Sequence, residues 1–125
     1  MRTIHLIILF ISSLNATDMR GLIFNGNCTT CHFETKTVSA PSMKIVKENY
    51  LRAFPLKKDF VENMSKWVVK PNKETSIMSN SIDKHGLMPE LGFDFTTLEE
   101  ISSYIYDTDF TIEKNPSPKK SLSIQ

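Results

Sequence analysis

The five residues from position 28 to position 32 read Cys-Thr-Thr-Cys-His, and they constrain this chain more than any other stretch. Two thiols separated by two residues, with an imidazole beside the second, can bind the two vinyl groups of a haem and place the histidine under the iron. Cys28 and Cys31 are the only cysteines of the sequence, so none is left for a structural disulfide. We therefore expect the chain to fold around one covalently attached haem c, with His32 as the proximal iron ligand.

Two other interpretations of the motif stay open at this point. A thiol redox pair of the thioredoxin type would need a βαβ pattern beside it, and no such strand pattern is visible. A structural zinc site would need four ligands. Cys28, Cys31, His32 and His85 supply that number, although Cys31 and His32 are neighbours in the sequence and a second ligand pair is missing.

The N-terminal segment 1–16 has the pattern of a secretory signal peptide. Arg2 provides one early positive charge, an apolar run extends from Leu6 to Ile11, and Ala16 offers a small residue for cleavage. The run is shorter than the roughly 20 residues that a helix needs to span a bilayer. Because haem is attached to such motifs outside the cytoplasm, we expect a periplasmic protein without a transmembrane segment in its mature chain.

The remaining sequence is long enough for one small domain, which we place at residues 17–113. Residues 114–125 are polar and contain prolines, so they offer almost nothing to bury and predict a disordered tail. The whole chain has 15 Lys and Arg against 14 Asp and Glu, and losing Arg2 with the signal peptide leaves 14 against 14. No basic excess favours nucleic acid as a partner.

Hydrophobic periodicity predicts helices and no strands, so the expected fold class is all-α. The first helix has Asp18 as its N-cap and extends to about His32, which places the thiols at its end. The last helix begins with a capping box, Thr-Thr-Leu-Glu. The predicted helices are, in chain order, 18–32, 57–70 with Pro71 as its stop, 77–86, and 96–107.

The sixth iron ligand decides whether the iron is closed, as in an electron carrier, or open to substrates. A thioether is the expected partner of histidine in a carrier, because a soft neutral sulfur favours ferrous iron. Met88 lies in a glycine-flanked loop, and Pro89 directs it toward an extended conformation. Met64 and Met78 have the helical spacing of core-packing residues. We therefore select Met88, with His85 as the rival ligand.

Taken together, these features resemble the class I cytochromes c, small proteins with one haem. Phe24, four residues before the motif, and Tyr104, in the last predicted helix, resemble the aromatic residues of two helices that cross in that family. Met88 and Pro89 resemble its distal-ligand loop. The resemblance covers residues 18–107 and implies a small cytochrome c fold, in which helices wrap around the haem.

The resemblance also implies roles for residues around the haem. Pro41 resembles the proline whose carbonyl accepts a hydrogen bond from the proximal histidine. Arg20 stands where the family often has a small residue, and Gly21 follows it, so we expect the helix crossing to be shifted by one residue. Three side chains lie where family members bind or neutralise the haem propionates: Tyr50, Arg52 and Trp67.

The function implied by the resemblance is a monomeric periplasmic electron carrier, not an enzyme, that exchanges single electrons with redox proteins. Two alternatives stay open: a haem c peroxidase-like or sensor protein with a labile sixth ligand, and a dedicated electron-transfer subunit of a larger oxidoreductase.

Overall fold

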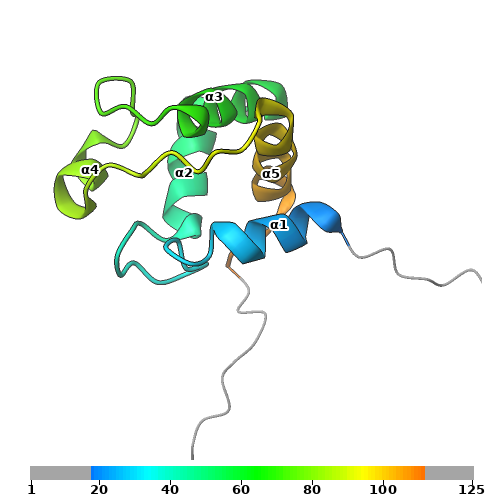
Figure 1. Cartoon of the computed structure of the whole chain (residues 1–125), viewed down its shortest axis with the longest axis horizontal. Helices are drawn as coiled ribbons and strands as arrows, with labels where there is room; N and C mark the ends of the chain where they lie inside the picture. Colours follow the sequence, from blue (N-terminus) through cyan, green and yellow to red (C-terminus); the bar gives the residue numbers. More distant parts are fainter. Residues whose placement is uncertain (1–17, 112–125) are drawn as a thin grey trace, which may run out of the picture.

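The computed structural model describes residues 18–111, and this part of the chain forms helices without a strand (Figure 1). The all-α prediction is confirmed. Residues 1–17 and 112–125, which include the predicted signal peptide and tail, lie outside the described part, as do both ends of the predicted domain. No described helix combines the length and the apolar character needed to cross a membrane. The helices are α1 (Met19–Asn27), α2 (Met43–Ala53), α3 (Lys57–Val69), α4 (Ser79–His85) and α5 (Phe95–Asp107).

The first helix begins where the sequence predicted and ends earlier. The Asp18 side chain caps α1 by accepting a hydrogen bond from the backbone N–H of Arg20 at 3.0 Å. The helix ends at Asn27, and Cys28 is its C-cap. Asparagine and glycine are poor helix formers, and they occupy the last three positions of α1. The prediction that the helix reaches His32 was therefore wrong, and the motif follows the helix in a turn.

The boundaries of α3 and α4 agree closely with the prediction. Pro71 comes two residues after the end of α3 and cannot continue a helix. Gly86 caps α4 with a φ of +84°, a left-handed conformation that favours glycine.

The last helix ends as predicted, but it begins one residue earlier and has a different cap. Asp94 is the N-cap, and its carboxylate accepts hydrogen bonds from the backbone N–H of Thr97 at 2.9 Å and from the Thr97 hydroxyl at 2.7 Å. The capping box predicted at 96–99 was wrong, because the aspartate two residues upstream satisfies the free N–H groups first.

Helix α2 was not predicted from the sequence. Ser42 is its N-cap, and its hydroxyl accepts a hydrogen bond from the N–H of Ile45 at 3.3 Å. Met43 and Tyr50 are buried on one side of the helix, with Val46 between them. A serine cap followed by apolar residues at positions i, i+3 and i+7 is the signal that would have revealed this helix.

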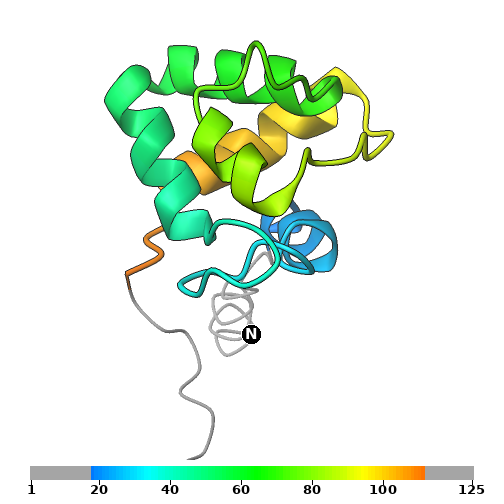
Figure 2. The ribbon, with the colours of Figure 1, turned by 90° about the vertical axis from the view of Figure 1, so that its left-hand side faces the viewer.

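The core lies where α5 meets α3 and α1 (Figures 1 and 2). Phe24 of α1 and Tyr104 of α5 meet at the predicted crossing, with ring centroids 5.2 Å apart and planes tilted by 44°. Gly21 permits the close approach, because a Cβ atom there would lie 3.0 Å from the Tyr104 ring. The shift of the crossing from Arg20 to Gly21 is thus present in the structure.

Candidate functional site

A cavity of about 330 Å³ lies between the turn that follows α1 and the segment around α4. Helices α2, α3 and α5 contribute the remaining walls, so residues from every part of the described fold meet there. The lining side chains are mostly apolar. None of the described Lys, Arg, Asp or Glu residues lines the cavity, and its only ionisable nitrogen bases are His32 and His85. The walls are therefore suited to a large apolar ligand.

The motif residues Cys28, Cys31 and His32 all line this cavity. The backbone N–H of His32 donates to the carbonyl of Cys28 at 2.9 Å, which closes the turn between them. Cys28 is half-buried, and burial raises the pKa of its thiol to about 11, whereas Cys31 is exposed. The local turn thus brings two thiols and one imidazole to the same wall.

The imidazole of His32 is held by a hydrogen bond to Pro41. Its Nδ1 atom lies 2.7 Å from the Pro41 carbonyl oxygen. Since a carbonyl can only accept, Nδ1 carries a proton, and in the neutral ring Nε2 then keeps a free lone pair. This is the tautomer in which Nε2 can bind a metal ion, and the hydrogen bond fixes the orientation of the ring.

Backbone hydrogen bonds connect the turn that carries His32 to the start of α2. The N–H of Met43 donates to the carbonyl of Phe33 at 2.8 Å, and the N–H of Lys44 donates to the carbonyl of Glu34 at 3.0 Å. These bonds use N–H groups that the first turn of a helix leaves free. This wall of the cavity is therefore tied to a helix by its backbone as well as by the His32 side chain.

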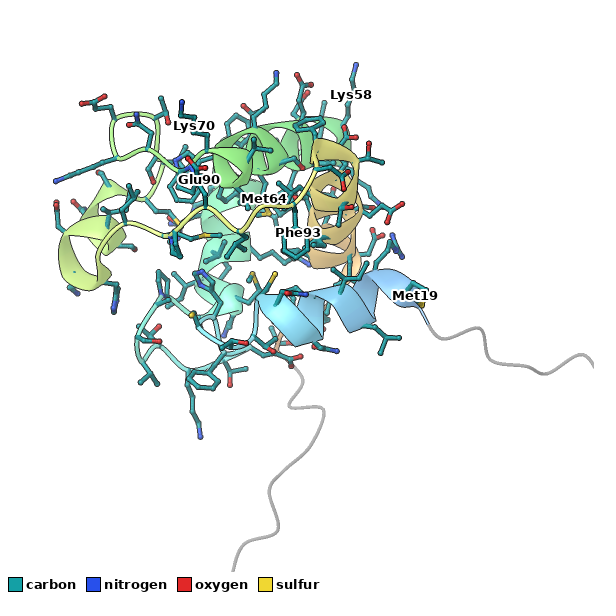
Figure 3. All side chains as sticks on the ribbon, viewed as in Figure 1. Met19, Lys58, Met64, Lys70, Glu90 and Phe93 are labelled. Carbon is teal, nitrogen blue, oxygen red and sulfur yellow. The ribbon has the colours of Figure 1, made fainter. Side chains whose placement is uncertain are left out.

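Four methionines line the cavity, and they differ in how firmly they are held. Met43 and Met64 are buried in α2 and α3, and Figure 3 labels Met64 and also Phe93, which lines the same cavity. Met88 lies half-buried in the loop after α4, as predicted from sequence. Met78 is the N-cap of α4 and not the helical core residue that its spacing predicted, and its place in the cavity wall makes it a second candidate thioether.

Tyr50 lies in the cavity wall and is buried, with 6 % of its surface exposed. Its ring packs edge-on against Phe60, with centroids 5.7 Å apart. The hydroxyl makes no hydrogen bond to another described residue, and burial raises the pKa of Tyr50 to about 12. The phenol therefore remains a proton donor over the whole neutral range.

Arg52 and Trp67 are placed differently from Tyr50. Arg52 is exposed on α2, does not line the cavity, and donates to the Glu48 carbonyl at 3.4 Å. Trp67 lines the cavity, but its indole N–H donates to the Asn72 carbonyl at 2.9 Å. Of the three side chains assigned to propionates, Tyr50 alone combines a place in the wall with a polar group that makes no hydrogen bond to the described residues.

The zinc interpretation lacks its ligand set in this part of the chain. Between residues 18 and 111, no group of three or more His, Cys, Asp or Glu side chains is placed to hold a metal ion.

Comparisons with protein-family models, with curated proteins and with solved structures found no match.

Proposed function

We propose that this chain is a class I type cytochrome c that carries single electrons between redox proteins through one covalently attached haem. One observation carries the proposal: the imidazole of His32, oriented by Pro41 at 2.7 Å, shares an uncharged cavity with both cysteines and with Met88. A lone metal ion would need more donors than this wall offers. A porphyrin brings four nitrogen donors of its own and needs only axial ligands and an apolar pocket.

The two cysteines would fix the cofactor. Each cysteine sulfur would bond to one carbon of a vinyl group, and its thiol hydrogen would go to the other carbon, so the addition would need no oxidant or reductant. Cys28 and Cys31 lie on the same wall as His32, so attachment and ligation would both occur in one turn. Bound haem would supply a one-electron couple, and the axial residues would set its potential.

Met88 is the proposed sixth ligand, on the segment that forms the wall around α4. Together with His32, the thioether of Met88 would keep the iron closed to substrates and would favour its ferrous state. Met43 and Met64 are fixed inside helices, so they serve as packing residues of the wall. Met78 is the competitor that an experiment has to distinguish from Met88.

The polar contacts of the haem would be few. Tyr50 is the proposed hydrogen-bond donor to a propionate, because its hydroxyl lies in the wall and stays protonated. The Trp67 N–H already has a partner, and Arg52 lies outside the cavity. Without a cation in the wall, the propionate charges favour ferric iron and lower the potential.

The cellular setting follows from the proposed chemistry. We infer export by the signal peptide at 1–16, haem attachment in the periplasm, and brief contacts of a monomer with donor and acceptor proteins. Interfaces of such redox encounters are small, typically below ~1,200 Å². Nucleic acid is not a proposed partner.

The proposal is tested by producing the full chain, with its own N-terminal segment, in cells that contain the c-type haem attachment machinery. We expect a coloured protein whose haem stays on the polypeptide in a denaturing gel. Cys28→Ala/Cys31→Ala loses the bound haem, whereas the control Thr30→Ala, an exposed position between the two cysteines, retains it. A correctly exported but colourless parent chain contradicts the proposal.

The distal ligand is tested by Met88→Ala. We expect loss of the weak far-red band of a thioether bound to ferric iron, and a fall in potential by a few tenths of a volt against the ~0.8 V range that axial ligands span. The matched variant Met78→Ala keeps the band. The reverse result assigns the ligand to Met78. An open iron in the parent protein supports the peroxidase-like or sensor alternative, and stable purification with a larger enzyme supports the subunit alternative.

A further inference from the structure

His85 is the second imidazole that lines the cavity, and it has no role in the function proposed above. It is the last residue of α4, and Gly86 separates it from the loop that carries Met88. The chain has three histidines: His32 is held by Pro41, and His5 lies in the segment expected to be removed. In the mature chain, His85 is therefore the one imidazole left that can approach the site.

The segment that carries His85 is held far less firmly than the opposite wall. Helix α4 has no buried residue and packs extensively against no other described helix. An ion pair between Lys73 and Asp83 connects it to the preceding loop, and both of these side chains are more than half exposed. Exposed pairs of this kind contribute little to stability. Local rearrangement of α4 and its loop is therefore easier than rearrangement of the turn around His32.

The hinge for such a rearrangement is also present. Gly86 adopts a φ of +84°, and a Cβ atom built there would meet no other atom within 4 Å. Because glycine lacks a Cβ and adopts a wide range of φ and ψ, the loop from Gly86 to Met88 can change direction at this residue. Met88 and His85 are three positions apart on opposite sides of this glycine, so a local movement can withdraw one side chain and advance the other.

We propose that His85 is a reserve axial ligand, whose imidazole coordinates the iron whenever the Met88 sulfur leaves it. This inference rests on the proposed function. The thioether departs with its own lone pair, and the imidazole nitrogen supplies another, so the iron keeps its oxidation state and no oxidant is required. An imidazole that is protonated at the outset releases one proton to water.

The exchange depends on the oxidation state of the iron. Ferrous iron favours the soft thioether, whereas ferric iron tolerates the harder nitrogen better. Oxidation therefore shifts the population toward His85, and reduction shifts it back toward Met88. In either state the iron has six ligands, so loss of the methionine does not open a site for peroxide or gases. This closed state distinguishes the inference from the sensor alternative.

The experiment compares ferric Met88→Ala with Met88→Ala/His85→Ala by electron paramagnetic resonance. We expect a low-spin signal with two nitrogen axial ligands in the single variant and a high-spin signal in the double variant. Added imidazole should bind the double variant at least about tenfold more tightly, because no internal ligand competes with it. The matched control Met88→Ala/Met78→Ala should behave like Met88→Ala.

A high-spin Met88→Ala protein that has covalent haem and native helix content overturns the reserve-ligand proposal and leaves the proposed function intact. A sulfur-ligated Met88→Ala protein also overturns it, in favour of Met78. Absence of covalent haem from the parent chain instead refutes the proposed function. Met88→Leu, which preserves side-chain volume in the loop, repeats the comparison should the alanine variant not fold.

Discussion

The carbonyl oxygen of Pro41 lies 2.7 Å from Nδ1 of His32, nine residues earlier in the chain. This contact orients the imidazole before any ligand binds, because it selects the tautomer with a free Nε2 and limits rotation of the ring. The backbone bonds from Met43 and Lys44 to the turn hold the same loop in place. This preorganised imidazole is the strongest structural support for the proposed iron site.

Changing Pro41 should weaken the hydrogen bond that orients the His32 imidazole. Pro41→Ala keeps a carbonyl but removes the ring that restricts the backbone, so we expect a weaker hydrogen bond. In NMR spectra the Nδ1 proton of His32 should exchange with water faster than in the parent protein. The matched control is Pro55→Ala, because the Pro55 carbonyl accepts a hydrogen bond from Tyr106 at 3.1 Å. Equal exchange rates in parent and Pro41→Ala would argue against the orienting role.

The crossing of α1 and α5 predicts opposite effects for two glycines of one helix. Gly26→Ala adds a methyl group with no atom within 4 Å and should stabilise the protein by about 1 kcal/mol through helix propensity. Gly21→Ala places the same group 3.0 Å from the Tyr104 ring. We expect it to be about 1–3 kcal/mol less stable than Gly26→Ala, the usual cost of overpacking. Chemical denaturation measures both, and equal stabilities would contradict the tight crossing.

The cap of α5 distinguishes the structure from the sequence prediction. Asp94→Ala removes both hydrogen bonds to Thr97 and should lower the midpoint of thermal unfolding, whereas Thr96→Ala should change it little. Hydrogen bonds from Thr97 hold the pKa of Asp94 below its usual 3.8. The stabilisation is therefore present above pH 3.8 and disappears as the pH falls through the lower folded-state pKa. A larger decrease of the unfolding midpoint in Thr96→Ala than in Asp94→Ala would support the capping box at 96–99.

Tyr50 should make the protein sensitive to alkali. Burial raises its pKa from 10.0 to about 12, so the folded state keeps the phenol proton at a pH where the unfolded chain loses it. Its contribution is complete below pH 10 and is lost as the pH rises from 10 to about 12. At about 1.4 kcal/mol per pKa unit, the loss reaches about 2–3 kcal/mol. Free energies of unfolding at pH 9, 10 and 11 should fall more steeply for the parent than for Tyr50→Phe.

The uncharged wall predicts that an added cation raises the reduction potential. Ser39 lines the cavity, so Ser39→Lys brings a positive charge near the proposed iron and disfavours its ferric state. Because water partly screens the interaction between the two charges, we expect the reduction potential to increase by an amount on the order of tens of millivolts. Ser79→Lys, at an exposed position of α4 that does not line the cavity, is the control. Potentiometric titration of both variants measures the effect, and equal shifts would argue against a local effect of the wall.

Local sequence signals determined the helical class and the limits of several helices. Asp18, Pro71 and Gly86 act on their immediate neighbours, so their effects were readable without a fold. The Cys-Thr-Thr-Cys-His motif is equally local, because one turn contains all of its donors. The same reasoning failed at α5, where two overlapping caps compete and the sequence does not show which one is used.

Tertiary structure decided what surrounds the motif. Arg52 lies outside the cavity and Met78 lies in its wall because the packing of the helices, not spacing along the chain, sets which side chains converge. The contacts between Gly21 and Tyr104 and between His32 and Pro41 likewise depend on how separate segments approach each other. One local turn thus supplies the two thiols and the imidazole of the motif. The neutral, apolar space around them results from long-range packing.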